Sequence, residues 1–303
     1  MDGFDFRGGY FMKKILFVYS YSCKPSQYIG TALWHINSLG VQLDRVFIND
    51  YVSYDDSEYD CLIYNTFANE NQVRKFYKKA VDVTDEKYHK FKGMKILLDS
   101  HDSAILDGFN RFNDKTTPRI KIQGGHDFIK EYNVIATATL RSWFANTYSG
   151  EEKIVPLIYC GNKGPFQHKI RELTLERLKP FNPITKKFSL RNYGNLLRSA
   201  KISVGVPGWG EVGSSHIDSV ATKCALFSHE SIKSVKMFPF ADLIDNYNYI
   251  SYNFDNIEDR MRELIQDEDK IKFIAENGYE YFKEGYNPQR TGQEILNYIR
   301  TNL

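Results

Sequence analysis

The sequence has few cysteines and no long apolar run. The four cysteines stand at positions 23, 61, 160 and 224, too far apart for the paired spacing of a zinc site. Three of them lie in apolar stretches, which indicates buried, reduced thiols and a cytoplasmic protein. No apolar run approaches the about 20 residues that a membrane-spanning helix needs, so we expect no integral membrane segment.

The sequence also has little net charge and no dinucleotide fingerprint. Lys and Arg number 40 and Asp and Glu 38, and the formal charge of +2 is too small to indicate nucleic-acid binding by itself. The run Gly208-Trp209-Gly210 does not make a GxGxxG motif, so we expect no nicotinamide cofactor. No cluster of histidines or acids has ligand spacing, so we expect neither a metal nor another cofactor.

What the chain does have is apolar runs that alternate with helical patterns over 303 residues, a length typical of two domains. We expect strands at 14–19, 41–48, 61–64, 94–98 and 134–138, and again at 154–159, 202–206, 224–227 and 249–252. Helices are expected near 26–39, 69–81, 168–178, 193–198, 257–266, 270–283 and 288–302. This alternation predicts an α/β fold with two doubly wound parallel-sheet, Rossmann-like domains. We place the boundary near residue 150, in a polar stretch.

Residues 202–229 combine a strand, a glycine-containing loop, a helix and a second strand. Ser214 and Ser215 lie where a helix N-cap belongs, and a helix N-terminus offers free N–H groups to phosphate. Glu211 lies in the loop, and Asp218 follows seven residues later, about one turn into the helix. A carboxylate there can accept from both hydroxyls of a ribose while the loop holds a diphosphate. The alternative is an ordinary turn whose acids are solvated or favoured by the helix dipole.

A second candidate site follows the first strand of the second half. The turn Gly161-Asn162-Lys163 precedes a helix that begins with His168 and carries Arg171. Cations at that point supply a charge that suits a diphosphate. The alternative is a solvated, basic helix face, which is the commoner location of Lys and Arg.

A third candidate lies directly after the strand at 94–98, where the chain reads Asp99-Ser100-His101-Asp102. Polar groups just past a buried strand are where an α/β domain places its chemistry. His101 or Asp102 would position an acceptor hydroxyl, or Asp102 would take its proton. The alternative is that these residues only cap the next helix.

The second half, from about residue 154 to 302, resembles the C-terminal domain of GT-B glycosyltransferases related to glycosyl transferase group 1, especially the CgeB-like proteins. The resemblance is carried by residues 161–171, 201–206 and 211–229, and by the helix pattern at 258–282. Three features depart from the family pattern. The two acids are one position closer than usual, the second acid is Asp218 rather than Glu, and Lys223 stands where the family has glycine.

The resemblance implies a GT-B architecture, with residues 1–150 as an acceptor-side domain and 151–285 as a nucleotide-sugar-binding domain. Residues 286–303 are then a helix that crosses back to the first domain. The activity it implies is transfer of a hexosyl or pentosyl group from a nucleoside diphosphate sugar to a hydroxyl of a glycan, a protein or a modified DNA base. The resemblance also implies a reaction that needs no metal and that retains the anomeric configuration. The catalytic candidates are Asp102, His101 and Glu211. The donor-binding candidates are Gly161, Asn162, Lys163, His168, Arg171, Gly213, Ser214, Ser215, His216 and Asp218.

Two other functions fit the same pattern. A noncatalytic GT-B scaffold would bind a nucleotide sugar or glycan in an assembly role, and the shortened acid spacing and Lys223 favour it. A two-lobed sugar-binding receptor would share the architecture but needs an export signal. We interpret residues 14–19 as a first strand rather than as the core of such a signal, because the apolar run is short.

Overall fold

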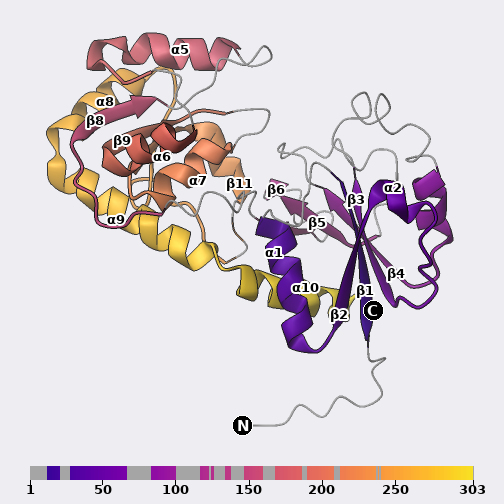
Figure 1. Ribbon diagram of the computed structural model, residues 1–303. Coiled ribbons are helices and arrows are strands. Elements are labelled where there is room, and N and C mark those ends of the chain that lie inside the picture. The colour runs from indigo at the N-terminus through magenta and orange to yellow at the C-terminus, as the bar shows by residue number, and fades with distance from the viewer. Residues whose placement is uncertain are drawn as a thin grey trace.

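The computed structural model describes residues 12–20, 28–66, 83–99, 117–122, 124–125, 134–137, 147–159, 168–185, 190–207, 212–236, 238 and 240–302. These residues form two parallel β-sheets with helices packed against both faces of each sheet (Figure 1). The predicted class, α/β with two doubly wound parallel sheets, is therefore confirmed.

The first sheet has six parallel strands in the order β2-β1-β3-β4-β5-β7. They are β1 (Lys14–Tyr19), β2 (Gln42–Phe47), β3 (Cys61–Thr66), β4 (Met94–Asp99), β5 (Arg119–Ile122) and β7 (Val134–Thr137). The chain goes from β1 to β2 on one side and then to β3 on the other. The switch point of the sheet therefore lies between β1 and β3, and open α/β sheets bind ligands at the carboxyl ends of such strands.

Alternate side chains of β1 fill two different cores. Ile15 and Phe17 pack with α1 (Tyr28–Trp34) and with the last helix, α10 (Pro288–Thr301), whereas Leu16 and Val18 pack on the opposite face. Because both faces of the strand are buried, the sequence reads as an apolar run rather than as an alternation. The short elements η1 (His35–Leu39) and α2 (Ile48–Tyr51) flank β2.

The second sheet has four parallel strands in the order β12-β10-β9-β8. They are β8 (Val155–Tyr159), β9 (Ala200–Gly205), β10 (Ala225–His229) and β12 (Ile250–Tyr252). Helices α6 (Leu190–Ser199) and α7 (Ser214–Ala221) cover one face, and α5 (His168–Leu178), α8 (Ile257–Gln266) and the start of α9 (Glu268–Gly285) cover the other. Turns η3 (Lys179–Phe181) and η4 (Glu230–Ser234) complete this half.

The last helix connects the two halves. After α9, the chain continues into α10, which lies beside α1 and buries Ile295, Leu296 and Ile299 in the core of the first sheet (Figure 1). A Cβ on Gly292 would lie 2.3 Å from the carbonyl oxygen of Ala32, so the two helices approach closely. A two-residue antiparallel pairing between β6 (Gly124–Gly125) and β11 (Val235–Lys236) also joins them. The domain boundaries at residues 150 and 285 stay a prediction.

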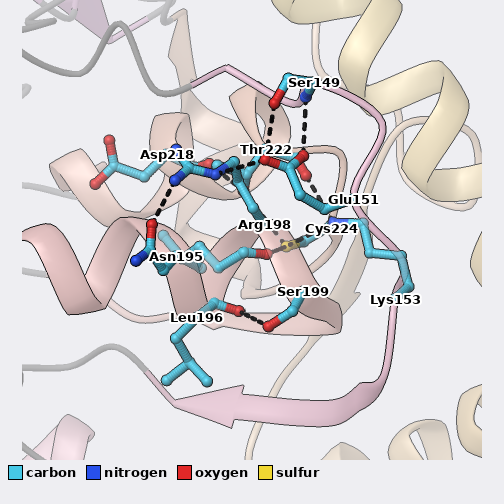
Figure 2. A network of polar contacts seen from close by, with 11 residues as sticks. Ser149, Glu151, Lys153, Asn195, Leu196, Arg198, Ser199, Asp218, Thr222 and Cys224 are labelled. Carbon is cyan, nitrogen blue, oxygen red and sulfur yellow. Dashed lines mark hydrogen bonds and ion pairs between the residues drawn. The ribbon is translucent and has the colours of Figure 1, made fainter.

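The segment before β8 is fixed to the second half by polar contacts (Figure 2). The carboxylate of Glu151 accepts from the Ser149 backbone N–H at 2.9 Å and pairs with Arg198 Nε at 2.8 Å. Lys153 Nζ donates to the Thr222 carbonyl oxygen at 2.7 Å. Arg198 lies on α6 and Thr222 follows α7, so this segment is tied to the ends of both helices.

Most elements follow the predicted ranges, with specific differences. The helix expected at 26–39 is an α-helix only to Trp34 and continues as a 3-10 turn, which ends at Gly40 with a left-handed φ of 81°. Strands β5 and β6 were not expected from the sequence. The helix expected at 69–81 lies outside the described residues.

Candidate functional site

The carboxyl edge of the second sheet leads directly into helix α7. Strand β9 ends at Gly205, the chain passes Pro207, and Gly213 is the N-cap of α7 in an extended conformation. The prediction that Ser214 or Ser215 is the N-cap is wrong, because the helix begins one residue earlier. Residues 214 and 215 lie in the first turn, where helix N–H groups have no partner within the helix and suit an anion.

His216 holds this turn in place. Its Nδ1 accepts from the Gly213 N–H at 3.0 Å, and its Nε2 lies 3.1 Å from the Ser228 hydroxyl at the end of β10. A Cβ on Gly205 would lie 2.6 Å from the ring, so only glycine allows this packing against β9. The ring is therefore fitted between two strands and the helix that follows.

The histidine is neutral. Burial, with a smaller contribution from the positive charge of Arg171, lowers the pKa of His216 from 6.5 to about 4, although the hydrogen bond with the Gly213 backbone acts in the opposite direction. A neutral ring that accepts at Nδ1 carries its proton on Nε2 and donates it to Ser228. Donor binding by His216 stays a prediction, and the geometry gives this side chain the role of positioning Gly213.

Arg171 reaches the same place from α5. Its Nε donates to the carbonyl oxygen of Pro207 at 3.2 Å, and the hydroxyl of Tyr159 donates to the Arg171 carbonyl oxygen at 3.1 Å. The guanidinium lies near enough to His216 to affect its pKa. One predicted cation and the first turn of α7 are thus brought together, as an anion site between them requires.

Asp218 lies further along α7 and is 2% exposed. The hydroxyl of Tyr193, on α6, donates to its Oδ2 at 3.2 Å. Figure 2 shows the carboxylate directed away from the contacts of Glu151 and Arg198. The acid therefore belongs to the contact between α6 and α7 rather than to the segment before β8.

The structure shows how lysine is accommodated at position 223, where the family pattern has glycine. It has a φ of 58°, in the left-handed region that glycine adopts without strain. Its ammonium pairs with Glu276 on α9 and lies 4.9 Å from the centre of the Tyr148 ring. The turn needs a left-handed residue here, and the lysine adds contacts that glycine lacks.

The first sheet carries a buried polar cluster at its carboxyl edge. Ser20 follows β1 and donates to Asn65 Oδ1 at 2.6 Å, across the switch point between β1 and β3. Asn65 Nδ2 and the Thr66 hydroxyl both donate to the Leu98 carbonyl oxygen. Asp99, fully buried, ends β4 at the same edge. The cluster fixes the strand that leads to His101 and Asp102.

Several predicted residues lie outside what the structure describes. These are His101, Asp102, Gly161, Asn162, Lys163 and Glu211, together with the side chains of His168 and Ser214. Of the predicted donor-binding residues, Arg171, Gly213, Ser215, His216 and Asp218 are described, and they gather around α7 and the end of β9.

Tyr159, Tyr193 and Ser228 were not predicted from the sequence as residues of this site. Tyr159 and Ser228 lie at strand ends, which is a signal that could have drawn attention to them. Tyr193 reads as one more aromatic residue in a helical pattern, and its contact with Asp218 depends on how α6 and α7 pack.

In the part of the chain that the structure describes, no three His, Cys, Asp or Glu side chains gather as metal ligands would. None of the helices described is long and apolar enough to cross a membrane.

Comparisons with known proteins bear on the fold. No protein-family model matches the chain, and no curated protein matches its sequence. Among solved structures, a glycosyltransferase from Rickettsia africae matches 97% of this chain and 99% of its own, with a TM-score of 0.61 and 9% identity. Sucrose-phosphate synthase from Thermosynechococcus elongatus matches 95% and 98%, with a TM-score of 0.60 and 9% identity. The chain has the GT-B fold.

A third GT-B structure was solved with a ligand. Anabaena HepE, in complex with UDP-glucose, matches 95% of this chain and 99% of its own, with a TM-score of 0.56 and 9% identity. The resemblance to GT-B enzymes expected from the sequence is confirmed at the level of the fold. Identities this low carry no residue roles across, and function must be argued from the site.

Proposed function

We propose that the protein is a glycosyltransferase that moves a sugar from a nucleoside diphosphate sugar to an acceptor hydroxyl. The observation that carries the proposal is the meeting of Arg171, the first turn of α7 and Asp218 at one edge of a GT-B second sheet. A cation and free N–H groups suit a diphosphate, and a carboxylate about one turn further along suits a ribose.

The donor is assigned to this edge residue by residue. Gly213, Ser214, Ser215 and Arg171 would hold the diphosphate. Gly161, Asn162 and Lys163, which follow β8 in the sequence, and His168, the first residue of α5, would add donors. Asp218 would accept from the ribose, and Glu211 would face the sugar. His216 would keep Gly213 and the helix N-terminus in place.

The acceptor is assigned to the first sheet. The bond from the anomeric carbon to the diphosphate oxygen breaks, and a bond from that carbon to the acceptor oxygen forms. Asp102 would take the acceptor's proton, and His101 would orient its hydroxyl. Helix N–H groups and Arg171 stabilise the diphosphate as it leaves, so the reaction proposed needs no metal. The loop motif that contains Glu211 and Asp218 favours retention of configuration.

The transferred group is a hexose or a pentose, and the acceptor is a glycan, a protein or a modified DNA base. We place the reaction in the cytoplasm. The two cysteines that the structure describes, Cys61 and Cys224, support this, since both are buried free thiols.

The test is turnover with a donor panel. UDP-, GDP-, CDP- and ADP-sugars are incubated with glycan, peptide and hydroxymethylated DNA acceptors, and release of the nucleoside diphosphate is followed by NMR. We expect one donor to be consumed only when an acceptor is present. Asp102→Asn should slow turnover at least about 100-fold, whereas Asp269→Asn, an exposed acid on α9, should not.

The noncatalytic scaffold predicts a different result. It is favoured by the shortened acid spacing, and it predicts that a donor binds but that no acceptor causes release. That outcome would replace the transferase with the scaffold.

A further inference from the structure

Trp34 presents an aromatic ring to solvent at the end of α1. The side chain is 50% exposed, and the guanidinium carbon of Arg45, on β2, lies 4.3 Å from the centre of its ring. Because the guanidinium covers one face of the indole, the exposed half consists of the opposite face and the ring edge. We call this open face the Trp34 platform, since a ligand can stack on it.

Arg45 keeps the ring of the platform in place. The guanidinium forms no ion pair with any residue that the structure describes. Its neighbour Asp44 accepts instead from Gln42 Nε2 at 2.7 Å and from the Tyr59 hydroxyl at 2.8 Å. The cation is therefore left to the indole, which it attracts through the negative face of the ring. A ring fixed in advance loses little freedom when a ligand binds.

The platform lies close to the carboxyl edge of the first sheet, to which the acceptor is assigned. Phe47 ends β2 two residues after Arg45, which is about 7 Å along a strand. Its ring lies 5.5 Å from that of Tyr19, which ends β1, and both rings are partly exposed. A chain of a few sugars can therefore rest on Trp34 while its end lies at this edge.

The chain around Arg45 carries an excess of acids. Residues 42–60 include six acids and a single cation, Arg45. Lys14, which approaches this stretch from β1, pairs with Glu58 at 2.7 Å. A nucleic acid needs several cations to neutralise its phosphates. The charge here disfavours a polyanion such as DNA and favours an uncharged ligand.

An uncharged sugar fits the platform by its own chemistry. One face of a pyranose carries C–H groups with a partial positive charge, which pack on the negative face of an aromatic ring. Its hydroxyls point outward from the ring, where the exposed side chains of Ser38 and Gln42 supply polar partners. A single open ring with polar surroundings is enough for a sugar, whereas a peptide needs a groove or a row of pockets.

We propose that Trp34 forms a glycan-binding subsite and that the acceptor is an uncharged oligosaccharide. A sugar several units from the reacting end stacks on the open face of Trp34, and Arg45 is a positioning residue that holds the indole. Naming this glycan as the acceptor rests on the proposed function, whereas binding of the glycan does not.

The first test measures binding of neutral hexasaccharides by NMR titration. The probes are α-1,4- and β-1,4-linked hexamers of glucose and the β-1,4-linked hexamers of mannose and N-acetylglucosamine. We expect at least one to bind wild type. Trp34→Ala should bind it at least about tenfold more weakly, and Trp34→Phe, which keeps a ring, should retain most of the affinity. Phe273→Ala, which removes an equally exposed ring on α9, is the control and should bind as wild type does.

The second test separates the subsite from a general loss of structure. With the hexasaccharide as acceptor, Trp34→Ala should raise KM about tenfold and leave kcat unchanged, because the reacting end still reaches the edge. With the corresponding disaccharide, which is too short to span both places, Trp34→Ala should change neither value. A distorted first sheet would affect both acceptors.

Three results overturn the proposal. They are equal binding of the hexasaccharide by wild type and Trp34→Ala, binding of none of the hexasaccharides by wild type, and binding through Trp34 of hydroxymethylated DNA or a basic peptide instead. Failure of the proposed function looks different. If a hexasaccharide binds through Trp34 but no nucleoside diphosphate sugar is consumed, the glycan subsite is supported and the transferase is not.

Discussion

His216 joins three elements at the carboxyl edge of the second sheet. It contacts Gly205 on β9, Gly213 at the start of α7 and Ser228 on β10. The ring has to be neutral to accept from Gly213, and complete burial keeps it so. A buried histidine of this kind makes stability depend on pH.

The unfolding free energy should fall as the pH falls from 6.5 to about 4. The pKa of His216 is near 6.5 in the unfolded chain and about 4 in the folded protein, so in this window the unfolded state binds more protons. The loss should approach about 3 kcal/mol at the acid end. Urea denaturation at several pH values, for wild type and His216→Gln, measures it.

The comparison with the variant removes the contribution of the carboxylates, which titrate in both proteins. His216→Gln should be less stable at neutral pH but should lose less stability on acidification. Equal pH dependence in the two proteins would show that His216 is not protonated in unfolding.

The sequence predicted which residues lie near the start of α7, but not what each of these residues does there. Its glycine loop and helix start placed Gly213 and Asp218 in one predicted site and Arg171 in a second, and the structure brings all three to the same edge. It did not show that His216 would be buried or that Tyr193 would contact Asp218. Both depend on packing between elements far apart in the chain, which no local pattern encodes.

The turn after α7 shows how an element end can depend on one backbone conformation. Lys223 adopts a φ of 58°, while its side chain pairs with Glu276 and lies over Tyr148. The left-handed conformation of a lysine lowers the stability of the folded protein, whereas the contacts of its side chain raise it. Two substitutions separate these effects.

Lys223→Gly should be more stable than Lys223→Ala by about 1 kcal/mol. Both variants lose the ion pair and the contact with Tyr148, but only glycine adopts the left-handed conformation without strain. Thermal or urea denaturation of the two proteins gives the difference directly. If the alanine variant equals the glycine variant, the turn does not have the left-handed conformation described here.

Elements with continuous apolar runs were predictable, and weakly patterned ones were not. Strands β1, β3, β4 and β10 are apolar because both faces are covered, and their positions were expected. Strand β5 reads Arg119-Ile120-Lys121-Ile122. Its two basic residues interrupt the apolar run that is typical of a strand in a parallel sheet, so it was not predicted. Trp34 ends α1 earlier than its periodicity predicts, since a 3-10 turn follows.

In the molecule as a whole, α10 packs the end of the chain against the first sheet. Its apolar face completes the core over β1, and Gly292 allows the approach to Ala32. Proteins of the GT-B fold have two sheets, and here α10, which follows the second sheet in the chain, packs against the first.

Gly292→Ala should destabilise the protein by about 1–3 kcal/mol, the range of an overpacked contact. A methyl group there would lie 2.3 Å from a backbone oxygen, so α10 would have to move away from α1. Alanine favours a helix over glycine by about 1 kcal/mol, so propensity alone predicts a gain in stability and a loss would come from the close contact. Glu294→Ala, an exposed change on the same helix, is the control. A gain in stability for Gly292→Ala would contradict this packing.

The melting temperature of wild type and Asp218→Asn, with and without nucleoside diphosphates, tests whether a nucleotide-sugar site lies at α7. At 100 times its dissociation constant, a ligand adds about 2.7 kcal/mol of stability. We predict that one of UDP, GDP, CDP and ADP raises the melting temperature of wild type and that Asp218→Asn loses most of this shift. A shift of equal size in Asp218→Asn, or none with any nucleotide in wild type, would contradict a nucleotide-sugar site at α7.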